Sequence, residues 1–172
     1  MVTMMKSCII PGSFDPVTKG HISLFESAAR VFDKVYVVIL VNSEKKGGMF
    51  TYDERLIILK KAVEALIDKG ISNIEAVMYS GLTTDAAKCL GAQFIVKGVR
   101  NITDFAYEYD LSEISRRFEP SLETVFLPSK AEFSCVSSTY VRELIKYGRF
   151  DSGDFADGTA ELIAELYKNK QA

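Results

Sequence analysis

The chain has no tryptophan, a single histidine and only three cysteines among its 172 residues. The cysteines, at positions 8, 89 and 135, are odd in number and lack the spacing of a metal site, which favours a reducing compartment over a disulfide-linked domain. With one histidine, neither a Ser/His/Asp arrangement for covalent catalysis nor a Cys/His metal cluster is present. These absences direct attention to chemistry that depends on positioning and charge.

Long apolar runs and a strong net charge are missing as well. The first six residues lack the apolar core of a secretory signal, and no run of apolar residues is long enough to cross a bilayer. The formal net charge is −2, whereas a nucleic-acid-binding protein usually carries a basic surface. We therefore expect a cytoplasmic protein with neither a membrane nor a nucleic acid as its partner.

Strand-like and helix-like segments alternate along the chain. Apolar, β-branched runs predict strands at 8–10, 35–41, 74–78, 94–96 and 124–127, and capping signals with helical periodicity predict helices beginning near 20, 51, 84, 104, 138 and 159. Strands separated by helices favour parallel pairing with right-handed crossovers. We expect residues 1–172 to form one α/β domain, a Rossmann-like doubly wound sheet of about five parallel strands with helices on both faces.

The predicted fold does not assign a chemistry by itself. No Gly-x-Gly-x-x-Gly follows the first strand, which argues against a dinucleotide-binding site, and no Gly-x-x-x-x-Gly-Lys-Ser/Thr is present, which argues against a P-loop. The evidence for function has to come from the segments that follow each strand.

The segment after the first strand has the composition of a phosphate site. Pro11-Gly12 is expected to break the strand, Ser13-Phe14-Asp15-Pro16 follows, and Thr18-Lys19-Gly20-His21 opens a helix. The start of a helix offers free N–H groups and the positive end of the dipole to an anion, and a histidine there is expected to be a neutral donor. The alternative is an ordinary strand-to-helix loop whose histidine bonds a neighbouring backbone group.

Basic and hydroxyl side chains follow three other predicted strands. Lys45-Lys46 lies in a loop, Lys97-Gly98-Val99-Arg100 comes after the fourth strand, and Val136-Ser137-Ser138-Thr139 opens a helix that carries Arg142. Taken singly, they could be a solvated lysine pair, a basic turn and a plain helix cap. Because the carboxyl ends of parallel strands share one edge of a sheet, we expect these groups and His21 to meet at one cleft suited to a polyphosphate.

Glu108 lies on the predicted helix that follows Arg100. Its carboxylate could accept a hydrogen bond from a ribose hydroxyl or from a cation such as Arg100, or it could be solvated. The neighbouring Tyr107 and Tyr109 are expected to pack in the core or against another subunit. For a phosphate nucleophile no general base is needed, because cations, N–H donors and Mg²⁺ lower the repulsion between the two reacting anions.

These motifs resemble those of the nucleotidylyltransferase superfamily. Thr18-Lys19-Gly20-His21 is similar to its Thr/His-x-Gly-His signature, and Val136-Ser137-Ser138-Thr139-Tyr140-Val141-Arg142 to its Ile-Ser-Ser-Thr-x-x-Arg signature. The order and spacing of the motifs resemble the bacterial phosphopantetheine adenylyltransferases in particular. The resemblance implies transfer of the adenylyl group of ATP to 4′-phosphopantetheine, with Mg²⁺ and no covalent intermediate, giving dephospho-coenzyme A and pyrophosphate. It also implies a homohexamer and feedback binding of coenzyme A.

The same resemblance implies roles for individual residues, assigns no metal ligand among them, and leaves open which side chain, if any, holds Mg²⁺. It places catalysis on His21, Lys45 and Arg100, and binding of the acceptor on Ser13, Lys45, Thr83 and Lys97. The implied ATP-binding residues are Ser13, Phe14, His21, Gly98, Val99, Arg100, Glu108, Phe133, Ser134, Cys135, Val136, Ser137, Ser138 and Thr139.

Several positions depart from the pattern of that family. Ser13 replaces the usual threonine, Lys97 a frequent arginine, Phe133 a common tryptophan, and Ile114-Ser115 a Met-Asn pair. An extra residue at Gly47-Gly48 leaves open whether Lys45 or Lys46 has the expected role. Two other functions remain possible on these residues: a nucleotidylyltransferase for nicotinamide mononucleotide or with CTP, and a nucleotide sensor without catalysis.

Overall fold

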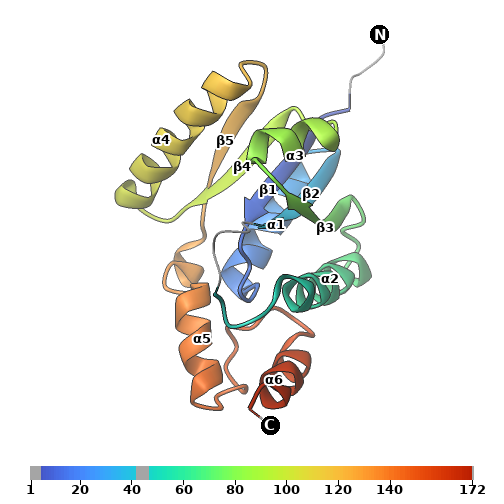
Figure 1. Cartoon of the computed structure of the whole chain (residues 1–172), viewed down its shortest axis with the longest axis vertical. Coiled ribbons are helices and arrows are strands. Elements are labelled where there is room, and N and C mark those ends of the chain that lie inside the picture. The colour runs from blue at the N-terminus through green and yellow to red at the C-terminus, as the bar shows by residue number, and fades with distance from the viewer. Residues whose placement is uncertain (1–4, 42–46, 172) are drawn as a thin grey trace.

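A computed structural model describes residues 5–41 and 47–171 of the chain (Figure 1). Its centre is one sheet of five parallel strands in the order β3-β2-β1-β4-β5. The strands are β1 (Ser7–Gly12), β2 (Lys34–Val41), β3 (Ile74–Ser80), β4 (Phe94–Val99) and β5 (Glu123–Pro128).

Six α-helices of the described residues accompany the sheet, and the predicted α/β fold is confirmed. They are α1 (Lys19–Val31), α2 (Tyr52–Asp68), α3 (Thr83–Cys89), α4 (Ile102–Phe118), α5 (Ser138–Lys146) and α6 (Ala160–Asn169), with a 3₁₀ turn η1 (Ala131–Phe133) before α5. No helix of these residues is long and apolar enough to span a membrane.

Helices cover both faces of the sheet, as the doubly wound architecture requires. Cys8 and Ile10 of β1 pack in a core shared with α1 and α2, while Ile9 between them packs against Ala86 and Ala87 of α3. Helix α4 packs against β4, β5 and α3, and α5 and α6 lie beyond the carboxyl ends of the strands, with α6 in contact with α2 (Figure 1). Burial on both faces explains why β1 and β2 are apolar without alternation.

The start of α2 shows the predicted capping box. The N–H of Glu54 donates to the Thr51 hydroxyl at 3.3 Å, and the Glu54 carboxylate accepts from the Thr51 N–H at 2.6 Å. The predicted apolar stripe is displaced slightly, because Leu56 is only partly buried whereas Ile58 is fully buried. The helix ends before Gly70, whose φ of +92° suits glycine.

Two predicted strand ends are wrong. Pro11-Gly12 does not break the first strand: both residues belong to β1 and pair with Val38 and Ile39 of β2. A proline is tolerated there because β4 pairs with β1 only at Cys8 and Ile9, so that near Pro11 no hydrogen bond to β4 is required.

Likewise, Lys97-Gly98-Val99 does not follow the fourth strand but forms its last three residues, paired with β5; only Arg100 lies beyond it. The glycine disfavours a strand prediction, since it has no side chain to pack. Here Leu24 of α1 fills the space: a Cβ on Gly98 would lie 2.9 Å from Leu24 Cδ2.

The order in which the chain adds strands to the sheet reverses between β1 and β4, and this reversal positions the site. From β1 the chain winds outward to β2 and β3, and from β4 it winds the other way to β5. Crevices at the carboxyl edge of such a switch point are where open α/β sheets bind ligands. Since only two residue pairs join β1 and β4, the two strands separate toward that edge.

Phe25 anchors α1 to the sheet, and its removal should destabilise the fold. The ring is fully buried and lies edge-on to Phe14, with 5.7 Å between the ring centroids. We expect Phe25→Ala to lower the free energy of unfolding by about 3–5 kcal/mol, since it leaves a large cavity. In urea denaturation, Val31→Ala on the exposed side of the same helix should change it by less than about 0.5 kcal/mol. Equal effects of the two variants would contradict this account of the core.

Candidate active site

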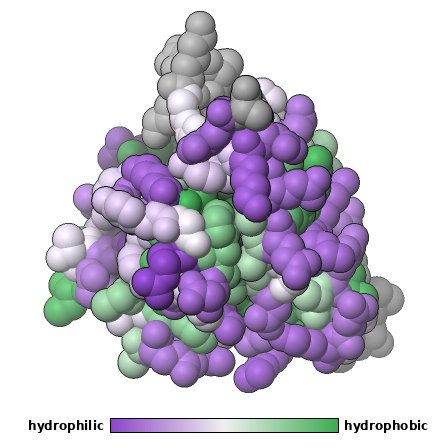
Figure 2. All heavy atoms as spheres, turned by 90° about the horizontal axis from the view of Figure 1, so that it is seen from below, coloured by the Kyte–Doolittle hydropathy of each residue, from purple (hydrophilic) through white to green (hydrophobic). Residues whose placement is uncertain are grey.

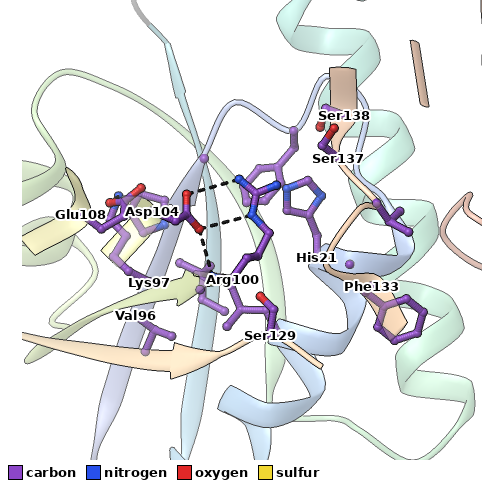
Figure 3. A pocket seen from close by; sticks show the side chains of 18 residues that line it. His21, Val96, Lys97, Arg100, Asp104, Glu108, Ser129, Phe133, Ser137 and Ser138 are labelled. Carbon is purple, nitrogen blue, oxygen red and sulfur yellow. Dashed lines mark hydrogen bonds and ion pairs between the residues drawn. The ribbon is translucent and has the colours of Figure 1, made fainter. Parts of the chain in front are cut away.

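A cavity of about 280 Å³ lies between β1, β4 and the start of α1 (Figure 3). The groups that line it come from segments far apart in the sequence: the first strand and helix, the fourth strand with the start of α4, and the segment that leads into α5. The lining residues with polar side chains are His21, Lys97, Arg100, Asp104, Glu108, Ser129, Ser137 and Ser138. The predicted convergence of His21, Arg100 and Ser137 at one edge of the sheet is confirmed.

His21 is held as a neutral donor by the backbone that precedes α1. The N–H of Thr18 donates to His21 Nδ1 at 3.0 Å, so the proton of the neutral ring is on Nε2. Burial, and to a lesser degree the Arg100 cation, lower the pKa of His21 to about 4. At neutral pH the ring therefore offers an N–H donor to an anion and carries no charge of its own.

The ring of Phe14 packs against the ring of His21. The ring is buried, and its centroid lies 5.1 Å from that of His21 in an edge-on arrangement. Phe14 has a φ of +41°, which is unfavourable for a non-glycine residue and reverses the chain after Ser13. Gly12 makes room for the ring, because a Cβ there would lie 2.7 Å from Phe14 Cζ.

Two cations of the cavity are paired with two carboxylates of α4. The Asp104 carboxylate accepts hydrogen bonds from Nε and Nη2 of Arg100, both at 3.3 Å, and from its backbone N–H at 3.1 Å. Lys97 Nζ lies 2.9 Å from Glu108 Oε2. Figure 3 shows the Arg100 guanidinium between Asp104 and the His21 ring.

Glu108 accepts from a cation, as one of the alternatives predicted, but that cation is Lys97 and not the example named, Arg100. The reason is spacing along the helix: Asp104 is four residues after Arg100 and nearer to it than Glu108, one turn later. Asp104 was absent from the predicted site, although its position one turn before Glu108 on a predicted helix was a usable signal. Hydrogen bonds from Arg100 outweigh the effect of burial and hold the pKa of Asp104 below its usual value.

The start of α5 closes the cavity opposite α4. Ser137 caps the helix by accepting from the N–H of Tyr140 at 3.2 Å, and the Ser138 hydroxyl donates to the carbonyl of Pro16 at 2.8 Å. Gly20 allows α1 to approach this segment closely, since a Cβ there would lie 2.9 Å from the Val136 carbonyl oxygen. Both helix starts therefore border one cavity, as an anion-binding site requires.

Asp15 connects the turn before α1 to the loop before α2 and to the helices α2 and α5, a role the sequence did not reveal. Its buried carboxylate accepts from the N–H groups of Met49 and Phe50, both at 2.9 Å, and pairs with Arg55 Nε at 3.3 Å. Its backbone carbonyl accepts from Arg142 Nη1 at 2.7 Å. No local pattern of the sequence predicts these distant partners.

The structure brings most of the predicted ligand residues together, and separates some. Of the predicted set, Phe14, His21, Lys97, Gly98, Arg100, Glu108, Phe133, Val136, Ser137 and Ser138 line the cavity. Ser13 lines an open cleft beside this cavity, and Thr83 lines a neighbouring apolar cavity. None of these three spaces is lined by Val99, Ser134, Cys135 or Thr139. Lys45 and Lys46 lie outside the described residues.

The neighbouring apolar cavity, of about 200 Å³, lies between α3, α4 and the sheet. Lys97 and Glu108 line both cavities, so the ion pair stands between them. Apart from this pair, half of its lining residues are aliphatic or aromatic, among them Leu111 and Phe118, and the other half are Ser or Thr, among them Thr83 and Ser115. Such a lining fits an uncharged chain with hydrogen-bonding groups.

Known proteins resemble this chain over most of its length. A family model described as cytidylyltransferase-like matches residues 9–144. A phosphopantetheine adenylyltransferase of Clostridium botulinum (strain Alaska E43 / Type E3) is 39% identical over 144 residues, which are 84% of this chain and 87% of the relative. The chain belongs to the phosphopantetheine adenylyltransferase family. Another member of the family, from Lachnoclostridium phytofermentans, is 37% identical over 98% of this chain and 99% of its own length.

The fold is also shared with a protein outside the phosphopantetheine adenylyltransferase family. A bifunctional NMN adenylyltransferase/ADP ribose pyrophosphatase of Francisella tularensis superposes with a TM-score of 0.69 over 98% of this chain and 54% of its own. The two sequences are 14% identical, so this likeness concerns the fold alone.

The protonation of His21 can be measured directly, because it is the only histidine of this family member. We expect its ring, followed by NMR, to titrate with a pKa near 4 and to carry its neutral proton on Nε2. Arg100→Gln should raise this pKa, since a nearby cation is lost, yet leave it below the usual 6.5 because burial remains. Arg116→Gln, at the far end of α4, should leave it unchanged.

The lowered pKa of His21 also makes the free energy of unfolding depend on pH. The unfolded chain takes up this proton near pH 6.5 and the folded protein only near pH 4, so His21 lowers the free energy of unfolding as the pH falls from 6.5 to 4. A pKa near 6.5 in the folded protein would contradict the described environment of the ring.

Proposed function

We propose that the protein transfers the adenylyl group of ATP to 4′-phosphopantetheine, giving dephospho-coenzyme A and pyrophosphate. The observation that carries this proposal is the convergence of His21, Lys97, Arg100 and the starts of α1 and α5 on one cavity. The relatives named phosphopantetheine adenylyltransferase, matched over nearly the whole chain, support the choice of acceptor.

The two neighbouring cavities suit the two substrates. ATP would occupy the cavity that contains His21 and Arg100, where helix starts and cations meet the triphosphate. The pantetheine arm, a chain of amides with apolar spacers, would occupy the apolar cavity beside Thr83. Since Lys97 lines both, its ammonium group would hold the phosphate of the acceptor close to the α-phosphate of ATP.

The reaction would proceed by direct attack in line with the leaving group. An oxygen of the acceptor phosphate forms a bond to the α-phosphorus, and the bond from that phosphorus to the bridging oxygen breaks, which releases pyrophosphate. The nucleophile is already an anion, so no side chain has to remove a proton. His21 Nε2–H and the Arg100 guanidinium would stabilise the charge that develops on the transferred and leaving phosphates.

Mg²⁺ fits this site as a companion of ATP. Within residues 5–41 and 47–171, no group of three or more His, Cys, Asp or Glu side chains could hold a metal ion. Protein-bound Mg²⁺ commonly keeps several waters and is held by substrate phosphates with one or two carboxylates. The phosphates would supply most of its ligands, Asp104 and Glu108 are the carboxylates of the lining that could add to them, and the ion would neutralise part of the charge on the leaving pyrophosphate.

Further expectations from the family belong to the same proposal: residues 1–172 act as one domain in the cytoplasm, as a homohexamer inhibited by coenzyme A at the active site. Exposed apolar side chains on α4 support assembly, since Tyr107 and Phe118 are each 63% exposed and Tyr109 is 47% exposed. The alternative that Tyr107 and Tyr109 pack in the core of their own chain is wrong.

The choice of acceptor can be tested by measuring the release of pyrophosphate. With ATP and Mg²⁺, we expect turnover when 4′-phosphopantetheine is supplied and none when nicotinamide mononucleotide replaces it. Replacing ATP by CTP should abolish turnover. Turnover with nicotinamide mononucleotide alone would refute the proposed acceptor, and tight binding of ATP without turnover on any acceptor would indicate a nucleotide sensor.

Loss of the His21 donor should slow the reaction. We expect His21→Ala to reduce kcat by roughly a few hundredfold, about 3–4 kcal/mol of transition-state stabilisation, with little change in the fold. Arg30→Ala at the far end of α1, away from the cavity, should leave kcat unchanged. Full turnover of the folded His21→Ala variant would exclude a catalytic role for this ring.

A further inference from the structure

Arg55, near the start of α2, is a buried cation that the proposed reaction does not use. Only 6% of the residue is exposed. Its Nε donates to the carbonyl of Phe50 at 2.8 Å and lies 3.3 Å from the Asp15 carboxylate, and its Nη1 donates to the carbonyl of Ser13 at 3.3 Å. One guanidinium thus contacts both the turn before α1 and the loop before α2.

The contact with Ser13 acts on a strained part of the backbone. The Ser13 carbonyl belongs to the peptide group that joins Ser13 to Phe14, and Phe14 has a φ of +41°. A non-glycine residue keeps such a conformation only where its surroundings hold it. The hydrogen bond from Arg55 fixes the orientation of this peptide group and so contributes to that hold.

Other groups hold the second half of the same turn. Arg142 Nη1 binds the carbonyl of Asp15, and the Ser138 hydroxyl binds the carbonyl of Pro16. Arg55 also pairs with the Asp15 side chain, but the backbone carbonyl that it binds in this turn, that of Ser13, belongs to the first half, the part that leads to the active site. There the Phe14 ring lies edge-on to the His21 ring, with 5.1 Å between the ring centroids. A rotation of the Ser13–Phe14 peptide group would therefore move the Phe14 ring relative to His21.

We propose that Arg55 is a positioning residue for adenylyl transfer: it holds the peptide group between Ser13 and Phe14 and, through the Phe14 ring, sets the position of His21. The inference rests on the proposed function only for its kinetic consequence. A lysine cannot replace this arginine, because a single ammonium group cannot reach the carbonyls of Phe50 and Ser13 and the Asp15 carboxylate with the geometry of a planar fork.

The test compares Arg55→Lys, which keeps the buried positive charge, with Lys61→Gln, which removes an exposed charge from the same helix. We expect Arg55→Lys to shift the NMR signals of the His21 ring and to lower kcat by roughly tenfold to a hundredfold in the folded protein. Lys61→Gln should change neither. A folded Arg55→Lys variant with a reduced melting temperature but unchanged His21 signals and unchanged kcat would show a purely structural role and overturn the inference.

Two features of the test keep its outcomes distinct. The His21 signals are read without turnover, so a wild-type protein that fails to use 4′-phosphopantetheine refutes the proposed function while the positioning role is still decided. If Arg55→Lys does not fold, the ¹⁵N signals of the wild-type Arg55 guanidinium decide. The contacts of the guanidinium with Phe50, Ser13 and Asp15 should hinder its rotation and give separate signals for the two Nη groups. Averaged signals would overturn the inference.

Discussion

β1 and β4 lie side by side at the centre of the sheet, yet they pair only through Cys8 and Ile9. Beyond these residues each strand continues with its outer neighbour: β1 stays paired with β2 to Gly12, and β4 with β5 to Val99. The winding of the chain reverses at this junction, so no crossover helix covers the gap at the carboxyl edge. The cavity, both helix starts and the cations of the site all depend on this separation.

The charges of the site are balanced before any substrate binds. Arg100 is paired with Asp104 and Lys97 with Glu108, so both of these cations of the described lining have a carboxylate partner. A polyphosphate entering the cavity would compete with these carboxylates for their partners. His21 adds a donor that remains neutral because burial and Arg100 both lower its pKa. This combination lets a site for anions exist in a chain whose formal net charge is −2.

Much of the fold and part of the site could be predicted from local patterns. The apolar run of β2, the capping box of α2 and the position of His21 after the first strand were predicted from neighbouring residues, since burial and capping leave short-range signals. The ends of β1 and β4 were not, because Pro11 and Gly98 disfavour a strand locally while pairing with β2 and β5 continues it. Which cation Glu108 meets was left open by the sequence, since two carboxylates one helical turn apart, Asp104 and Glu108, compete for two cations.

By itself, the sequence determined the alternation of strands and helices and the kinds of side chain that follow each strand, because these depend on residues close together in the chain. It also carried the motifs that mark the family. Only the tertiary structure decided that Asp15 binds Met49, Phe50 and Arg55, and that Phe14 supports His21 in a strained conformation. These contacts join segments up to 40 positions apart (Asp15 to Arg55), and no local pattern encodes which buried charge meets which distant partner.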